Sequence, residues 1–168
     1  MPRGRDSQRA KVYRWEGDAL VGRLCGLASQ TLDLEACAAL VERAWHDYWP
    51  GCPPQLRDGR GCRRAWGNHL EIALPRWART ERVVLHETTH ALLYKLAAVS
   101  DHGPEFVRLY IDLLARYHYP KVPKATLLAS ARAASLKIAR IAACPQPERG
   151  VTHRPRPASI STERGDAT

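Results

Sequence analysis

The chain has 168 residues, of which 45% are hydrophobic, so it is long and apolar enough to bury the core of one domain. It contains no apolar run of 18 residues, which excludes a transmembrane helix, and its first residues lack the apolar stretch of a signal peptide. The five scattered cysteines are compatible with a cytoplasmic protein, and the formal net charge of +9 allows weak association with nucleic acid.

The N-terminal part is predicted to contain a basic segment followed by two helices. Residues 1–14 carry five basic side chains and one acidic one. Apolar residues then recur at helical spacing over residues 16–29. A second helix is predicted over residues 32–48, with Thr31 or Asp33 as its N-cap.

A loop and a β-hairpin are predicted next. Residues 50–60 are rich in proline and glycine, as is typical of a loop. The hairpin consists of a strand over 62–66, a Gly67-Asn68 turn, and a strand over 69–74 in which apolar and polar residues alternate. Because the second strand directly precedes the next helix, it is a candidate edge for pairing with an extended peptide, unless the chain itself covers it.

Three further helices follow the hairpin. Thr80 is the expected N-cap of the first, over residues 81–97, and Pro104 opens the second, which runs to residue 117. The third is predicted over residues 124–142, where four basic residues accompany an apolar stripe.

These elements predict a single α+β domain, mostly helical, with a short antiparallel sheet or hairpin before the helix at 81–97. The expected organisation is a basic segment over 1–14, the domain over 15–142 and a tail over 143–168. The tail is rich in proline, serine and arginine and lacks aromatic residues, which predicts disorder.

One motif in the predicted helix 81–97 carries chemistry: His86-Glu87-Thr88-Thr89-His90. Residues i and i+4 lie on one helical face, so both imidazoles can bind the same metal ion. Glu87 lies next to the first ligand and can act as a general base on water without binding the metal itself. The pattern is the His-Glu-x-x-His arrangement of zinc hydrolases.

A catalytic zinc site requires a third protein ligand and one open position. His102 is the best candidate, because the chain can fold back over the distance between the end of the helix and this residue. Glu105 and Asp101 are alternative ligands. Asp101 and Asp112 are otherwise expected to cap a helix or to support a metal ligand by a hydrogen bond.

The motif followed by His102-Gly103-Pro104-Glu105-Phe106 resembles the SprT-like, or Spartan-type, zinc metalloproteases over about residues 60–115. The resemblance implies a zincin-like domain. Carried over to this chain, it implies that His86, His90 and His102 bind zinc and that Glu87 is catalytic. The opening segment Arg5–Tyr13 is also similar to a small group of actinobacterial proteins described as metallohydrolases.

The predicted function is therefore that of a zinc-dependent metallohydrolase, in the first place a metalloprotease acting on a peptide or protein. Two alternatives stay open: a basic DNA-associated protein with a structural metal site, and a zinc amidohydrolase acting on a non-peptide substrate. Tyr94, one turn after His90, is a candidate for stabilising the developing oxyanion, or else a core residue.

Overall fold

Five helices and a small sheet make up the described chain, which is therefore of the α+β class. The computed structural model describes residues 6, 8–18, 31–97 and 101–140. Its helices are α1 (Arg9–Trp15), α2 (Leu34–His46), α3 (Glu81–Ala97), α4 (Pro104–Tyr117) and α5 (Lys124–Ala133). Its strands are β1 (Gln55–Asp58), β2 (Trp66–Gly67) and β3 (Glu71–Leu74), and a 3-10 turn, η2 (Arg76–Ala78), leads into α3.

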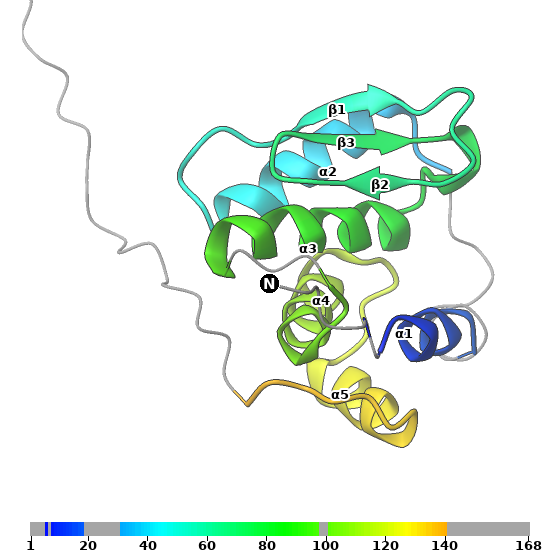
Figure 1. The fold of residues 1–168 in the computed structure, drawn as a ribbon, viewed down its shortest axis with the longest axis vertical. Helices are drawn as coiled ribbons and strands as arrows, with labels where there is room; N and C mark the ends of the chain where they lie inside the picture. Colours follow the sequence, from blue (N-terminus) through cyan, green and yellow to red (C-terminus); the bar gives the residue numbers. More distant parts are fainter. Residues whose placement is uncertain (1–5, 7, 19–30, 98–100, 141–168) are drawn as a thin grey trace, which may run out of the picture.

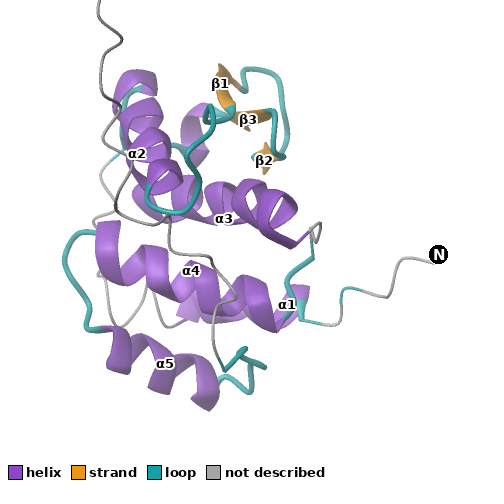
Figure 2. Cartoon of the chain, turned by 90° about the vertical axis from the view of Figure 1, so that its left-hand side faces the viewer, coloured by secondary structure: helices purple, strands orange, loops and turns teal. Residues whose placement is uncertain are grey.

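Helix α3 runs through the middle of the fold. Figures 1 and 2 show the sheet and α2 on one side of α3, and α4 on the other, with α5 beyond α4. The Thr80 hydroxyl accepts the Val83 N–H at 3.5 Å, as expected of the predicted cap. The helix that carries the motif is therefore capped at its N-terminus and packed between α2 and the sheet on one side and α4 on the other.

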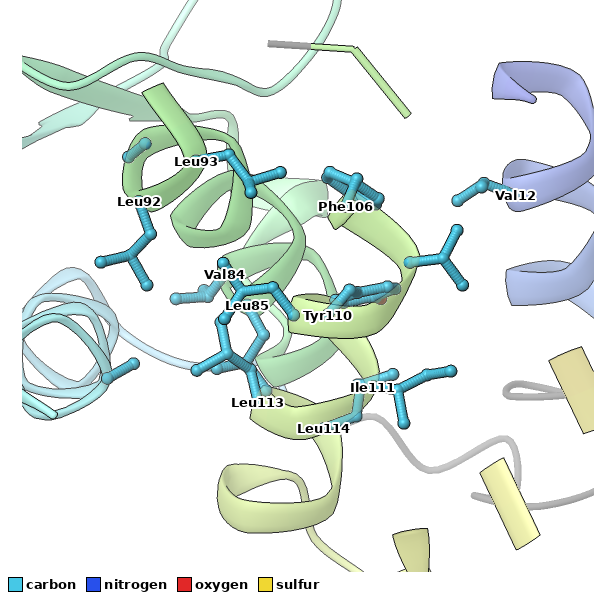
Figure 3. Packing of buried hydrophobic residues seen from close by; sticks show 14 of the residues in the cluster. Val12, Val84, Leu85, Leu92, Leu93, Phe106, Tyr110, Ile111, Leu113 and Leu114 are labelled. Carbon is cyan, nitrogen blue, oxygen red and sulfur yellow. The ribbon is translucent and has the colours of Figure 1, made fainter. Parts of the chain in front are cut away.

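The hydrophobic core lies mainly between α3 and α4. Val84 and Leu85 of α3 pack near Tyr110 and Leu113 of α4, and all four side chains are fully buried (Figure 3). Helix α2, which was predicted over residues 32–48, adds an apolar stripe to this core. Its buried members are Cys37, Leu40, Val41, Ala44 and Trp45. The N-cap predicted at Asp33 is confirmed, because its carboxylate accepts the Ala36 N–H at 2.7 Å.

The sheet is mixed, whereas an antiparallel one was predicted. Its strand order is β1-β3-β2, with β1 parallel and β2 antiparallel to β3. Strand β1 lies inside the predicted loop 50–60, so that prediction was wrong for Gln55–Asp58. Its register with β3 pairs Gln55 with Glu71 and Asp58 with Leu74. Pairing with a strand further along the chain outweighs a local composition that is typical of a loop.

The hairpin exists, but its turn lies further along the chain than predicted. Gly67 belongs to β2 and pairs with Ile72. The Asn68 side chain accepts the N–H groups of Leu70 and Glu71 at 2.8 and 3.0 Å, so an Asx turn reverses the chain. Because β3 is flanked on both sides, the predicted peptide-binding edge at 69–74 was wrong, and the alternative that the chain itself covers this strand holds. The edge strands of the sheet are β1 and β2.

The last helix is shorter than the predicted 124–142. Helix α5 ends at Ala133, and Ser135 adopts a left-handed backbone conformation with φ of 57°. The Leu136 N–H donates to the Ala131 carbonyl at 3.0 Å across this turn, as in a Schellman C-cap. The longer prediction included the apolar residues Leu136 and Ile138. They pack against the core, but outside the helix.

The N-terminal segment is part of the core. Helix α1 crosses the boundary expected between residues 14 and 15, and its Val12 and Trp15 are buried. The helix predicted over 16–29 lies largely outside the described residues, as do the tail over 143–168 and the last residues of the domain predicted over 15–142. Among the helices of the described ranges, none combines the length and apolar character needed to cross a membrane.

Candidate metal centre

Three histidines that are far apart in the chain converge beside α3. His86 and His90 lie one turn apart on α3, and His102 lies just before α4. The Nε2 atom of His86 is 3.2 Å from the Nε2 atoms of both His90 and His102. The ligand atoms of all three lie within 4.8 Å of one another, as a shared metal ion bound by the three predicted ligands would require.

The donor set and its spacing fit zinc. Zn–N bonds of about 2.0–2.1 Å in a tetrahedral arrangement place two ligand nitrogens about 3.3 Å apart. The two 3.2 Å separations agree with this value. Three imidazoles also leave one coordination position for water or substrate, which is the composition of a catalytic zinc site.

Two carboxylates fix the orientation of the imidazoles of His86 and His102. His86 Nδ1 donates to Glu16 Oε1 at 2.8 Å, and His102 Nδ1 donates to Asp6 Oδ2 at 2.7 Å. The Tyr110 hydroxyl also donates to Glu16, at 2.7 Å. With Nδ1 engaged in this way, a neutral imidazole directs the lone pair of Nε2 towards the point where the three rings meet.

The buried charges of the site influence one another. Burial acts to lower the pKa of His86, but the Glu16 carboxylate outweighs it and the pKa is raised. Burial likewise acts to raise the pKa of Glu16, yet His86 and Arg82 hold it below its usual range. For His102 burial prevails over Asp6, so its pKa is lowered. The neutral form that binds a metal ion is therefore favoured at His102.

Glu87 lies beside the three histidines and is itself buried, with 7% of its surface exposed. Burial raises the pKa of its carboxyl group, while His86 and a hydrogen bond from the Gly67 N–H act in the opposite direction. The two residues between Glu87 and His90 have structural roles, because the hydroxyls of Thr88 and Thr89 donate to the carbonyls of Val84 and Leu85 at 2.7 Å. Glu87 is thus the carboxylate of the motif available to accept a proton.

A cavity of about 750 Å³ opens onto His86 and Glu87. Helix α1 lines it with Tyr13, and the residues on either side of this helix add Asp6 and Glu16. The chain that leads into β2 also lines it, with Arg64 and Ala65. A substrate in this cavity would lie directly against the candidate base and one of the candidate ligands.

Three acidic residues considered in the sequence have other roles. Asp101 is exposed and accepts the Gly103 N–H at 3.0 Å, but it does not cap α4 as predicted, because Gly103 is the N-cap of that helix and no side chain caps its first turn. Glu105 is exposed in the first turn of α4. Neither belongs to the group of ligand atoms that converge. Asp112 does not support a ligand as predicted, because it pairs with Arg108 and Lys124 at 3.4 and 2.6 Å.

Sequence reasoning missed Tyr13, an aromatic residue whose ring lies next to those of His86 and His102. Its ring stacks on that of His86, with centroids 5.5 Å apart and an interplanar angle of 12°. Tyr94, the residue considered for oxyanion stabilisation, is 45% exposed and stacks instead on His69, with centroids 4.1 Å apart. It is neither a core residue nor one of the residues lining the cavity.

Replacing Glu16 by glutamine is expected to weaken zinc binding by about 10–100-fold, because an amide cannot stabilise the His86 imidazole as a carboxylate does. Competition with a fluorescent chelator would measure the dissociation constant. Glu105→Gln is the matched control, since this exposed side chain lies outside the ligand group, and its affinity is expected to equal that of the wild type. Equal affinities for all three proteins would contradict the role of Glu16.

Gly67 is the point of closest approach between β2 and α3. A Cβ atom at this position would lie 2.8 Å from the Glu87 carbonyl oxygen, so the strand or the helix would have to move. We expect Gly67→Ala to destabilise the fold by about 1–3 kcal/mol in urea unfolding. Gly17→Ala, where a Cβ atom meets nothing within 4 Å, is the control with little expected effect. A Gly67→Ala protein as stable as that control would refute the contact.

Comparison of the chain with protein-family models, with curated proteins and with solved structures gives no match.

Proposed function

We propose that this protein is a zinc-dependent metallohydrolase that cleaves peptide bonds, with His86, His90 and His102 as zinc ligands and Glu87 as the general base. The proposal includes a zincin-like architecture of the SprT-like type, which the motifs resemble. The observation that carries it is the convergence of three Nε2 atoms, two of them 3.2 Å from the third, next to a buried carboxylate that faces a cavity.

The support given to the histidines favours a stable metal site. Histidine ligands of zinc commonly donate their second ring N–H to a carboxylate, which fixes the tautomer and raises the basicity of the ligand. Glu16 and Asp6 provide this for His86 and His102. A buried Glu87 next to the ligands has no use in a purely structural zinc site, which favours a hydrolytic role over the DNA-associated alternative.

When bound, zinc would supply Lewis-acid polarisation of the scissile carbonyl group. Glu87 then performs the proton transfers of the reaction. Its carboxylate accepts a proton from the attacking water as the water oxygen bonds to the carbonyl carbon, and it delivers that proton to the amine nitrogen as the C–N bond breaks. Burial favours this role, because a pKa raised towards neutrality suits a group that must both accept and return a proton.

The proposal is tested by removing the metal with a chelator and restoring one equivalent of zinc. We expect the zinc-loaded protein to cleave unfolded casein and the metal-free protein to be inactive. Cleavage of small amides without cleavage of casein would replace the protease assignment by that of an amidohydrolase on non-peptide substrates. Absence of turnover on both kinds of substrate, with zinc bound, would contradict a hydrolase.

A further inference from the structure

The cavity beside Glu87 is lined by cationic side chains from three different segments of the chain. Arg9 comes from α1, Arg82 from the first turn of α3, and Arg64 from the chain leading into β2. Two exposed aromatic side chains also line the cavity: Trp77 of η2, 64% exposed, and Tyr13, 46% exposed. Exposed aromatic surface at a cavity is suited to contact with a ligand.

The acidic side chains of the cavity are already engaged. Asp6 accepts from His102, Glu16 accepts from His86, and Glu87 accepts from the Gly67 N–H. Asp6 and Glu16 therefore support candidate metal ligands, and Glu87 is the candidate base. The arginines are not the principal partners of these three carboxylates.

The arginines keep capacity for a further anion. Neither Arg9 nor Arg64 forms an ion pair with an acidic side chain in the part of the chain that the structure describes. Arg82 approaches Glu16 only at 3.6 Å, and its Nε makes no hydrogen bond with the described residues. A zinc ion held by the three histidines would add two further positive charges next to this cavity, which His86 lines. Guanidinium groups bind carboxylates through paired hydrogen bonds, which gives both affinity and orientation.

We propose that this cavity selects acidic peptides, binding an aspartate or glutamate side chain of the substrate through Arg64 and Arg9 while the scissile bond lies against His86 and Glu87. Arg82 contributes positive charge close to Glu87, and the rings of Trp77 and Tyr13 contact the apolar parts of the same peptide. This inference rests on the proposed function for its substrate, but the binding of an acidic peptide can be measured without turnover.

The first test uses matched peptides in which one glutamate is moved stepwise through the positions on both sides of the scissile bond, each with a glutamine counterpart. At the position that reaches the cavity, we expect kcat/KM for the glutamate peptide to exceed that of its counterpart by about tenfold, because a hydrogen bond between two charged groups is stronger than one to a neutral amide. Arg64→Gln should bring this ratio close to one.

Arg63→Gln is the matched control, because Arg63 is an exposed neighbour that does not line the cavity. It should keep the wild-type preference for the glutamate peptide. Equal cleavage of both peptides at every position would overturn the proposal. So would an equal loss of preference in the Arg63→Gln and Arg64→Gln proteins, because the effect would then come from the overall charge.

A binding experiment separates this inference from the proposed function. Fluorescently labelled glutamate and glutamine peptides are titrated with zinc-loaded Glu87→Gln protein, with and without Arg64→Gln, and anisotropy gives the Kd. We expect the glutamate peptide to bind about tenfold more tightly, and only while Arg64 is present. Equal Kd values would overturn the selection of acidic peptides. A Kd difference in a chain whose wild type hydrolyses nothing would refute the proposed function and leave the binding assignment standing.

Discussion

Replacing Glu87 by glutamine is expected to lower the rate of hydrolysis by about 10²–10⁴-fold and to leave the zinc content unchanged, because the amide keeps the shape of the side chain but cannot accept a proton. The amide oxygen can still accept the Gly67 N–H, so the fold around this buried position should persist. The measurement is kcat/KM on a peptide substrate together with zinc per chain by elemental analysis.

Glu42→Gln is a suitable control for this experiment, since Glu42 is an exposed residue of α2. It should match the wild type in both rate and zinc content. Loss of zinc from the Glu87→Gln protein, or its unfolding, would show that Glu87 supports the structure of the site. Full activity of the Glu87→Gln protein would refute its assignment as the base.

Replacing His102 by alanine is expected to reduce the zinc content from about one ion per chain to a small fraction. Loss of a carboxylate that supports a ligand weakens metal binding by up to about 100-fold, and we expect the loss of a ligand itself to weaken it further. Only His86 and His90 would then remain, and two imidazoles are fewer than the three protein ligands of a catalytic zinc site. Zinc per chain after dialysis, and the rise in Tm on adding zinc, measure the loss.

The control is His46→Ala, because His46 is an exposed histidine in the last turn of α2 and lies far from the ligand group in sequence. It should keep the zinc content and the zinc-dependent rise in Tm of the wild type. Retention of one zinc ion by the His102→Ala protein would move the third ligand to Glu105 or Asp101. That result would also remove the main support for the likeness to SprT-like enzymes.

The parts of the site that follow from local geometry could be predicted from the sequence. His86 and His90 share a helical face by their spacing alone, and the structure places them on α3 with the expected proximity. His102 could be predicted because the chain between it and His90 is short enough to limit where it can lie. Local propensity likewise predicted α2, α3 and α4 to within a few residues.

The supporting residues could not be predicted in the same way, because no local rule relates residues that are far apart. Asp6 and Glu16 contact histidines that follow them by 96 and 70 positions. The one available signal was that Asp6 is the single acidic residue among the first 14. Strand β1 was missed for a related reason. It forms its hydrogen bonds with β3, although β2 lies between these two strands in the sequence.

The contacts of Gln8 join the N-terminal segment to two distant parts of the chain. Its side-chain amide donates to the carbonyls of His102 and Lys137, both at 3.2 Å, and its Oε1 accepts the Lys137 N–H at 2.5 Å. These contacts close a loop of 129 residues, whose entropy cost must be met before the N-terminal segment can dock. Asp6, two residues before Gln8, accepts the hydrogen bond of His102, so the support of this ligand depends on the same docked segment. A change at Gln8, which is neither a ligand nor a supporting carboxylate, would therefore reach the metal centre through the N-terminal segment that it anchors.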